Sequence, residues 1–234
     1  LLVLTFVGLL WSFIYHEKRI ASPMIDLSFF STPVFGYGSL GLFMACITQG
    51  LTMFVTPFYL QDVLKLSPTF MGVIFLVPSL LSMVLAPVSG AMTDRIGARF
   101  LLITGVLILM VAFLIGANLQ ADSHWILPTA LLALTAGGST LFNTPSQAVM
   151  VSSLPKEHWG TAIGIINGIF GLGQMLGISL SGIFLTLAFR FYSGDPGTIP
   201  NPGDTHVFVA SMNVTYLFAL GIIFVPLLTS IKVK

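Results

Sequence analysis

A ten-residue stretch of the chain combines two glycines with three charged side chains: Gly90, Asp94, Arg95, Gly97 and Arg99. Asp94 can accept hydrogen bonds from the free backbone N–H groups of the helix that follows, where the helix dipole favours an anion. The arginines can pair with carboxylates, Gly90 allows two helices to approach closely, and Gly97 permits a tight reversal. These residue types predict a charge-stabilised turn between two helices, although composition alone favours an ordinary charged turn with no further role.

A second group of chemically useful side chains lies within long apolar segments. A pocket that is mostly apolar and has a few polar anchors suits a lipophilic cation. The candidates for such a cavity are Gln49, Met53, Phe54, Asn143, Gln147, Asn167 and Gln174. Asn143 and Gln147 are four residues apart, and Asn167 and Gln174 are seven apart, so each pair shares a helix face. The alternative is that these amides hydrogen-bond between helices, at about 0.6 to 2 kcal/mol each.

The elements that carry these residues are predicted to be membrane-spanning helices. Of the 234 residues, 56% are hydrophobic and only 7% are charged, which excludes a soluble domain. Six apolar runs have about the 20 residues that a helix needs to cross a bilayer. They are residues 34–60, 70–92, 100–118, 126–151, 161–189 and 207–231. Because the runs are apolar on all sides, we expect an all-α, polytopic transmembrane bundle and not a membrane barrel.

The start of the chain is a seventh apolar run, residues 1–15, which begins without Met and has no basic residues ahead of it. This pattern is unlike a secretory signal, and it predicts the end of a truncated transmembrane helix in a fragment of a longer protein. We expect residues 16–33 to form a cytoplasmic linker and residues 232–234 a cytoplasmic tail. The bundle between them, 34–231, divides into two three-helix repeats, 34–118 and 126–231, as in transporters built from inverted repeats.

The basic residues predict which side of the membrane each loop faces, since basic loops stay in the cytoplasm. Seven basic residues fall on one side and two on the other. The first side carries Lys18, Arg19, Arg95, Arg99, Lys156, Lys232 and Lys234, and the second carries Lys65 and Arg190. The C-terminus is therefore predicted to be cytoplasmic.

Glycines recur along the fifth full run at helical intervals. Gly160, Gly164 and Gly168 are four residues apart, and Gly173 and Gly177 follow with the same spacing. Small residues at this interval let helix backbones pack closely, and such seams are also places where helices can slide. The pattern favours close packing first.

Other chemistry is excluded by what the segments contain. The four histidines sit in four different loops, Cys46 is the only cysteine, and there is no phosphate-binding loop or nucleic-acid patch. We therefore expect no enzyme activity, no metal site and no nucleic-acid partner. No Asp, Glu, Lys, Arg or His lies well inside the six full runs, so a proton-coupling group would have to lie elsewhere in the protein.

Residues 90–99 resemble the G-x-x-x-D-R-x-G-x-R signature of the major facilitator superfamily. Residues 17–30, 59–72 and 155–164 look like matching stretches of the fourteen-span, EmrB/QacA-type drug:proton antiporters, in the same order. Lys65 replaces a usual glycine, and Trp159 replaces a usual basic residue. By this resemblance the six full runs are spans nine to fourteen, the C-terminal half of such a transporter.

The resemblance implies alternating access, in which two six-helix bundles rock about a central cavity. It makes the Gly90–Arg99 turn a conformational latch, with Asp94 stabilising the outward-facing form. It also implies a proton gradient instead of a bound cofactor, a small lipophilic or cationic substrate, and location in the bacterial inner membrane. The expected partners are the lipid bilayer and the missing N-terminal half, while a periplasmic adaptor stays open. The alternatives are a carrier for a metabolite or lipid, or a non-transporting membrane subunit.

Overall fold

The described part of the chain is an all-helical bundle. The computed structural model describes residues 27–194, 200–201 and 203–232, together with Gly8. Apart from Gly8, the predicted helix end 1–15 lies outside the described residues, as does most of the predicted linker. The long helices are α2 (Pro33–Phe58), α3 (Pro68–Ile96), α4 (Ala98–Ala117), α5 (Ile126–Ser152), α6 (Trp159–Ser193) and α7 (Thr205–Ile222). The short ones are η1 (Leu27–Ser31), η2 (Tyr59–Val63), η3 (Lys156–His158) and α8 (Phe224–Lys232).

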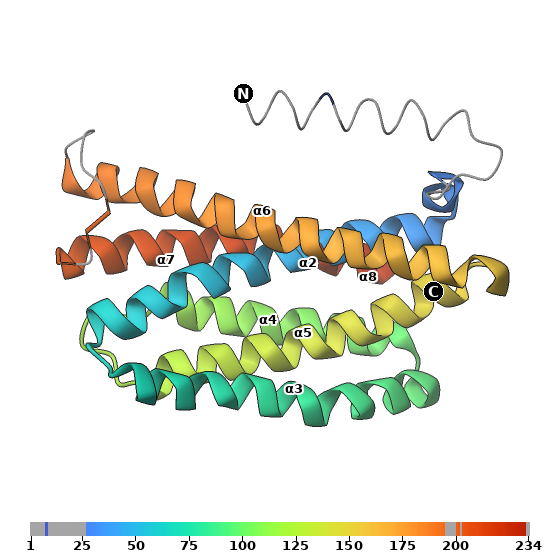
Figure 1. Ribbon diagram of the computed structural model, residues 1–234, viewed down its shortest axis with the longest axis horizontal. Helices are drawn as coiled ribbons and strands as arrows, with labels where there is room; N and C mark the ends of the chain where they lie inside the picture. Colours follow the sequence, from blue (N-terminus) through green and yellow to red (C-terminus); the bar gives the residue numbers. More distant parts are fainter. Residues whose placement is uncertain (1–7, 9–26, 195–199, 202, 233–234) are drawn as a thin grey trace.

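Six segments of the described chain are long and apolar enough to cross a membrane. They correspond to the six predicted runs, so the prediction of a polytopic helical bundle is confirmed. The helices run back and forth between two ends of the bundle (Figure 1). We call the end with η2 and the α4–α5 connection the Tyr59 end, and the end with Gly97, η3 and the last turn of α8 the Gly97 end.

Prolines shape where these helices begin and where one is interrupted. Pro33 and Pro68 occupy the first turns of α2 and α3, where a missing N–H costs nothing. Ser67 caps α3 by accepting a hydrogen bond from the backbone N–H of Phe70 at 3.3 Å. The last predicted run is divided into α7 and α8. Pro226 explains the division, because it lacks an N–H and its ring crowds the carbonyl four residues earlier.

The two halves of the bundle are interlocked. Helix α2 packs along α6 and also contacts α5, α7 and α8, while α5 packs along α3 and α4. In Figure 1, α6, α7 and α8 form the upper layer, α3, α4 and α5 form the lower layer, and α2 crosses between them. Helix α2, the first of residues 34–118, therefore packs on α6, the second of residues 126–231. In the same way α3, the second helix of the first repeat, packs on α5, the first helix of the second repeat.

Glycines bring two of these helix pairs into backbone contact. A Cβ on Gly50 would meet the backbone carbonyl oxygen of Gln174, and one on Gly177 would meet that of Ile47. Between α4 and α5, a Cβ on Gly105 would lie 2.7 Å from the carbonyl oxygen of Gly138. Only glycine fits at such contacts, so these positions fix the spacing of the α2–α6 and α4–α5 pairs.

The glycine pattern of α6 is only half right as a packing prediction. Gly173 and Gly177 do lie in the seam with α2, but Gly160, Gly164 and Gly168 face open space among the described residues. Their interval is correct for a seam, but α2 and α5 pack on the other face of this part of α6, where Ala162 and Ile166 are buried. The prediction of close packing at these three glycines is wrong for the described chain.

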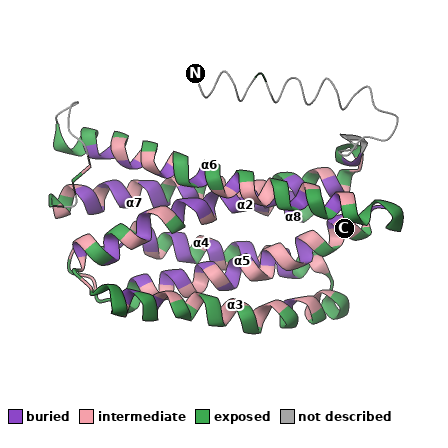
Figure 2. Ribbon diagram, viewed as in Figure 1, coloured by how far each residue is buried: buried purple, intermediate pink, exposed green. Residues whose placement is uncertain are grey.

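Exposed residues recur along α3 and α6, as the green stretches in Figure 2 show, and many of these residues are large and apolar. Exposed residues on α3 include Leu76, Leu80 and Met83, and on α6 they include Met175 and Leu187. Such surfaces are stable against lipid or against another apolar bundle, not against water. They agree with the membrane environment that the sequence predicts.

Hydrogen bonds between helices gather at the Tyr59 end. The hydroxyl of Tyr59 donates to the backbone carbonyl of Gln120 at 2.6 Å, and the amide nitrogen of Asn213 donates to the carbonyl of Leu119 at 3.1 Å. The hydroxyls of Thr56 and Tyr216 lie 2.8 Å apart. These bonds tie α2, the α4–α5 connection and α7 into one unit, on top of the main apolar core.

Candidate functional site

A polar cleft of about 560 Å³ lies within the bundle between α2, α3, α5 and α6. Its size is in the range of pockets that hold small molecules. Its polar lining residues are Gln49, Thr52, Ser79, Ser82, Thr135, Ser139, Thr140, Asn143 and Gln174. Its apolar lining residues are Met53, Phe75, Pro78, Leu132 and Ala136. We call this recess the central cleft.

Most hydroxyls of the central cleft use their donor on their own helix. Thr52 donates to the carbonyl of Thr48 at 3.0 Å, and Thr135 donates to that of Leu131 at 2.7 Å. This back-bonding lets Ser and Thr sit within a span at little cost, and it leaves their oxygen lone pairs turned toward the cleft. These hydroxyls can therefore accept hydrogen bonds from a ligand.

One hydroxyl pair joins two walls of the central cleft. Thr140 on α5 lies with its Oγ1 3.2 Å from the Oγ of Ser82 on α3, and it also donates to the carbonyl of Ala136 at 2.8 Å. This contact holds the lower walls together where α3 is otherwise mostly exposed.

Two buried oxygens in the central cleft have no partner among the described residues: Oδ1 of Asn143 and Oγ of Ser139. Both residues lie on α5, four positions apart, so they share a face. A buried polar atom left without a hydrogen bond costs about 1 to 3 kcal/mol. Water or a bound ligand would remove this cost, which makes this face of α5 the strongest polar anchor of the cleft.

The amides of α2 and α6 are weakly engaged. Nε2 of Gln49 donates to the carbonyl of Ala45 at a long 3.5 Å, and Nε2 of Gln174 lies 4.0 Å from the sulfur of Met53. Gln49 and Asn143 make no interhelical hydrogen bond with the described residues. The alternative of interhelical bonding is therefore not seen for these two residues.

Of the seven predicted cavity residues, four line the central cleft: Gln49, Met53, Asn143 and Gln174. Phe54 lines a different pocket, nearer the Tyr59 end. Gln147 is partly buried outside the cleft, and Asn167 is exposed. Asn167 shares a face with Gln174 but lies about 10 Å nearer the Gly97 end, beyond the reach of the cleft.

Sequence reasoning did not find the Ser and Thr residues of the central cleft. Thr135, Ser139 and Asn143 repeat every four residues on α5, and this polar stripe is the signal that marks them. No Asp, Glu, Lys, Arg or His lines the cleft among the described residues. The arrangement can bind a ligand through hydrogen bonds and apolar contact.

The charged turn differs in detail from its prediction. Helix α3 continues through Asp94 and Arg95 to Ile96, and α4 begins at Ala98 without a side-chain cap. Asp94 therefore lies in the last turn of α3, and the expectation that it caps α4 is wrong. It is exposed, and within the described chain no ion pair joins it to Arg95 or Arg99.

The structure bears out the predicted role of one glycine of this turn and not that of the other. Gly97 has φ 87° and ψ 149°, a conformation that essentially only glycine adopts, so its predicted role in the reversal is confirmed. Gly90 has nothing within 4 Å of where a Cβ would stand, so the expected close approach of two helices at Gly90 is wrong for the described residues.

The model of the Major Facilitator Superfamily matches residues 38–194, which include the whole of α3, α4 and α5. The chain belongs to the major facilitator superfamily. The resemblance seen in the Gly90–Arg99 stretch is therefore confirmed at the level of the superfamily, and the chain is an integral membrane protein of a transporter family.

Individual relatives within the superfamily are transporters or drug-resistance proteins. The chain is 26% identical to the riboflavin transporter RibZ of Clostridioides difficile (strain 630), over 92% of this chain and 46% of that protein. It is 25% identical to the lincomycin resistance protein LmrB of Bacillus subtilis (strain 168), over 95% and 48%. It is 27% identical to the multidrug resistance protein Stp of Mycobacterium tuberculosis, over 83% and 36%. The chain spans less than half the length of each of these relatives.

Proposed function

We propose that this superfamily chain is the C-terminal half of a multidrug efflux transporter that exchanges a lipophilic or cationic drug for protons by alternating access. The observation that carries the proposal is the central cleft. Its apolar walls and its unpaired Asn143 oxygen suit a lipophilic ligand that carries a few polar groups. The names of LmrB and Stp support drugs as the ligand class.

The central cleft is an open recess, bounded by only four helices. We infer that a second six-helix bundle, in the part of the protein that precedes this chain, closes it. The exposed apolar faces of α3 and α6 flank the cleft and are suited to face that bundle. In this proposal the repeats 34–118 and 126–231 form one half of the transporter, and residues 16–33 link it to the other half.

We further propose that the Gly97 end faces the cytoplasm of a bacterial cell. Four basic residues of the described chain are at this end: Arg95, Arg99, Lys156 and Lys232. Lys65 and Arg190 are at the other end. The exposed charges of Asp94 and Arg95 on the last turn of α3 are then free to contact the partner bundle, which is how the turn acts as a latch between transport states.

Proton coupling is assigned to the preceding half of the protein. The lining of the central cleft supports this assignment, since none of its described residues titrates. A charged group in the middle of a span costs about 2.5 to 3.5 kcal/mol on insertion scales and is retained only where it functions. In this proposal the chain supplies half of the cavity and one rigid rocking body, and it does not transport alone.

A metabolite carrier is the second candidate, favoured by the similarity to a riboflavin transporter. The amides of Gln49, Asn143 and Gln174 suit an uncharged heterocycle as well as they suit a drug, because amides both donate and accept hydrogen bonds. A non-transporting membrane subunit would have no use for such a cleft.

Efflux by the full-length protein separates these candidates. Cells that express it are loaded with ethidium, and efflux and drug tolerance are measured with and without a proton uncoupler. Antiport predicts efflux that stops with the uncoupler and a raised drug tolerance. Unchanged tolerance together with uncoupler-insensitive efflux would contradict antiport, and uptake of riboflavin without drug efflux would favour the metabolite carrier.

Variants of the amides test the central cleft itself. Asn143→Ala removes the unpaired oxygen and is expected to weaken drug affinity by about two- to tenfold, the loss of one hydrogen bond. The matched control is Asn167→Ala, which removes the same amide from an exposed position on α6 outside the cleft. Equal effects of the two variants would exclude the cleft as the binding site.

A further inference from the structure

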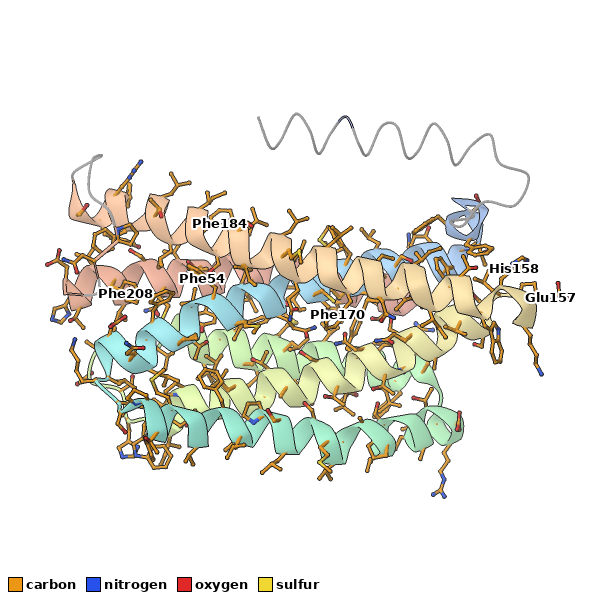
Figure 3. All side chains as sticks on the ribbon, viewed as in Figure 1. Phe54, Glu157, His158, Phe170, Phe184 and Phe208 are labelled. Atoms are coloured by element: carbon orange, nitrogen blue, oxygen red, sulfur yellow. The ribbon has the colours of Figure 1, made fainter. Side chains whose placement is uncertain are left out.

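A second pocket, of about 260 Å³, lies at the Tyr59 end between α2, η2, α6 and α7. Its lining includes three phenylalanines, one carboxylate and one hydroxyl: Phe54, Phe58, Phe208, Asp62 and Thr186. We call it the outer pocket. Figure 3 shows Phe54 and Phe208 near each other at this end, opposite Glu157 and His158.

The α2 wall of the outer pocket has a regular spacing. Phe54, Phe58 and Asp62 follow one another at intervals of four, so the three side chains lie on one side of α2 and η2. The ring centroids of Phe54 and Phe58 are 5.2 Å apart, with the planes tilted by 57°. Gly182 on α6 faces the Phe54 ring at 4.0 Å from where a Cβ would stand, which leaves room beside this ring.

The pocket has a closed floor and an open mouth. Phe208 is only 2% exposed and forms the floor, while Phe58 is 40% exposed at the surface. Phe58 therefore leaves a large apolar ring uncovered next to a carboxylate. Packing alone explains Phe208, but it does not explain why an exposed ring and an acid share one recess.

The carboxylate of Asp62 is partly buried and has no protein partner among the described residues. It has no hydrogen bond and no ion pair with any residue that the structure describes. A carboxylate that no protein group neutralises can attract a cation that enters the recess beside the rings. Aromatic faces attract cations too, most strongly when the cation is desolvated. Both features favour one class of ligand.

We propose that the outer pocket is a binding site for small lipophilic monocations, such as quaternary ammonium ions with one aromatic ring. The rings take up the apolar part and the charge, and Asp62 supplies the counter-charge. The volume is below the usual range for drug-sized ligands, so a small cation is the fitting occupant.

The outer pocket is distinct from the central cleft. Met53 lines the cleft and Phe54, the next residue, lines the outer pocket. On α6, Gln174 of the cleft and Gly182 of the outer pocket are eight residues apart, about 12 Å along the helix. The proposal rests on the proposed function only for the chemical class of the ligand. It adds a second site at the Tyr59 end of the bundle, away from the central cleft.

Binding of benzyltrimethylammonium to the full-length protein in lipid nanodiscs tests this proposal. Isothermal titration is compared for the wild type, Asp62→Asn, Phe58→Ala, the conservative variant Asp62→Glu and the central-cleft variant Asn143→Ala. The matched controls are Asp122→Asn, an exposed acid of the α4–α5 connection, and Phe191→Ala, a ring 82% exposed on α6. Thermal unfolding of each variant is measured alongside.

Asp62→Asn and Phe58→Ala are each expected to weaken binding by about three- to tenfold, while Asp62→Glu and both controls stay within about twofold of the wild type. Unchanged affinity in both pocket variants, or no binding by the wild type, would overturn the proposal. So would a loss that appears only in Asn143→Ala, since this places the cation in the central cleft. Because the readout is binding, its failure is separate from a failure of uncoupler-sensitive efflux.

Discussion

Replacing Gly177 by alanine is expected to push α2 and α6 apart. A methyl group on this residue would overlap the backbone carbonyl oxygen of Ile47 and would lie 3.0 Å from the Cα of Gly50. Ordinary contacts between carbon atoms are about 3.5 to 4.0 Å. Because the obstructing atoms belong to the backbone, no side chain can turn away, and the helices themselves must separate by about 0.5 to 1 Å.

The loss of stability depends on how much of the α2–α6 contact such a shift disturbs. Gly173, one turn earlier, lies where a Cβ would be 2.8 Å from the Cβ of Cys46, so this contact loosens as well. Forcing extra volume into a packed interface typically costs about 1 to 3 kcal/mol. We expect Gly177→Ala to be at the upper end of this range.

The assay is thermal unfolding of the full-length protein in one detergent, with Gly164→Ala as the matched control on the same helix. Gly164 has open space around it, and alanine is the better helix former by up to about 1 kcal/mol, so this variant is expected to unfold at or above the wild-type temperature. Wild-type stability of Gly177→Ala, or an equal loss in Gly164→Ala, would refute the reasoning.

Three further changes give sharp expectations. Gly97→Ala forces a side chain into a φ of 87° and is expected to cost about 1 to 3 kcal/mol in unfolding experiments, with no effect expected if the turn rearranges freely. Tyr216→Phe removes the bond to Thr56, which keeps its bond of 2.8 Å to its own helix, so a loss of only about 0.5 to 1.5 kcal/mol is expected by the same measurement. Asp94→Asn is expected to reduce efflux while membrane insertion, measured by immunoblot of membrane fractions, is unchanged; normal efflux at matched expression would remove Asp94 from the mechanism.

The membrane spans were predictable because apolar length decides whether a segment can cross a bilayer. Their ends were less so, because a helix does not stop where its apolar run stops. The predicted run 70–92 ends before the charges, yet α3 continues through Asp94 and Arg95, which helices tolerate, until Gly97 breaks it. Pro226 divides the last span into α7 and α8. The apolar run continues through this proline, so the length of the run does not reveal the division.

The amides of the central cleft were predictable because an amide within a span is costly and stands out. Ser139 and Thr135 were missed for the opposite reason, since a hydroxyl can bond to its own helix and leaves no trace in an apolar run. Which glycines pack was not predictable either. Gly164 and Gly177 have similar surroundings in the sequence, and only the place of the neighbouring helix distinguishes them.

The interlocking of α2 with α6 has a consequence for how the chain is made. A membrane protein enters the bilayer helix by helix in the order of synthesis, and more than 100 residues separate Gly50 from its seam partner Gly177. Until α6 emerges from the ribosome, the narrow face of α2 has only lipid or an insertion chaperone against it. The same delay is much shorter for α4 and α5, which follow one another directly. Assembly therefore begins with α4 and α5, and the helix made first among the six is the last to be fully enclosed.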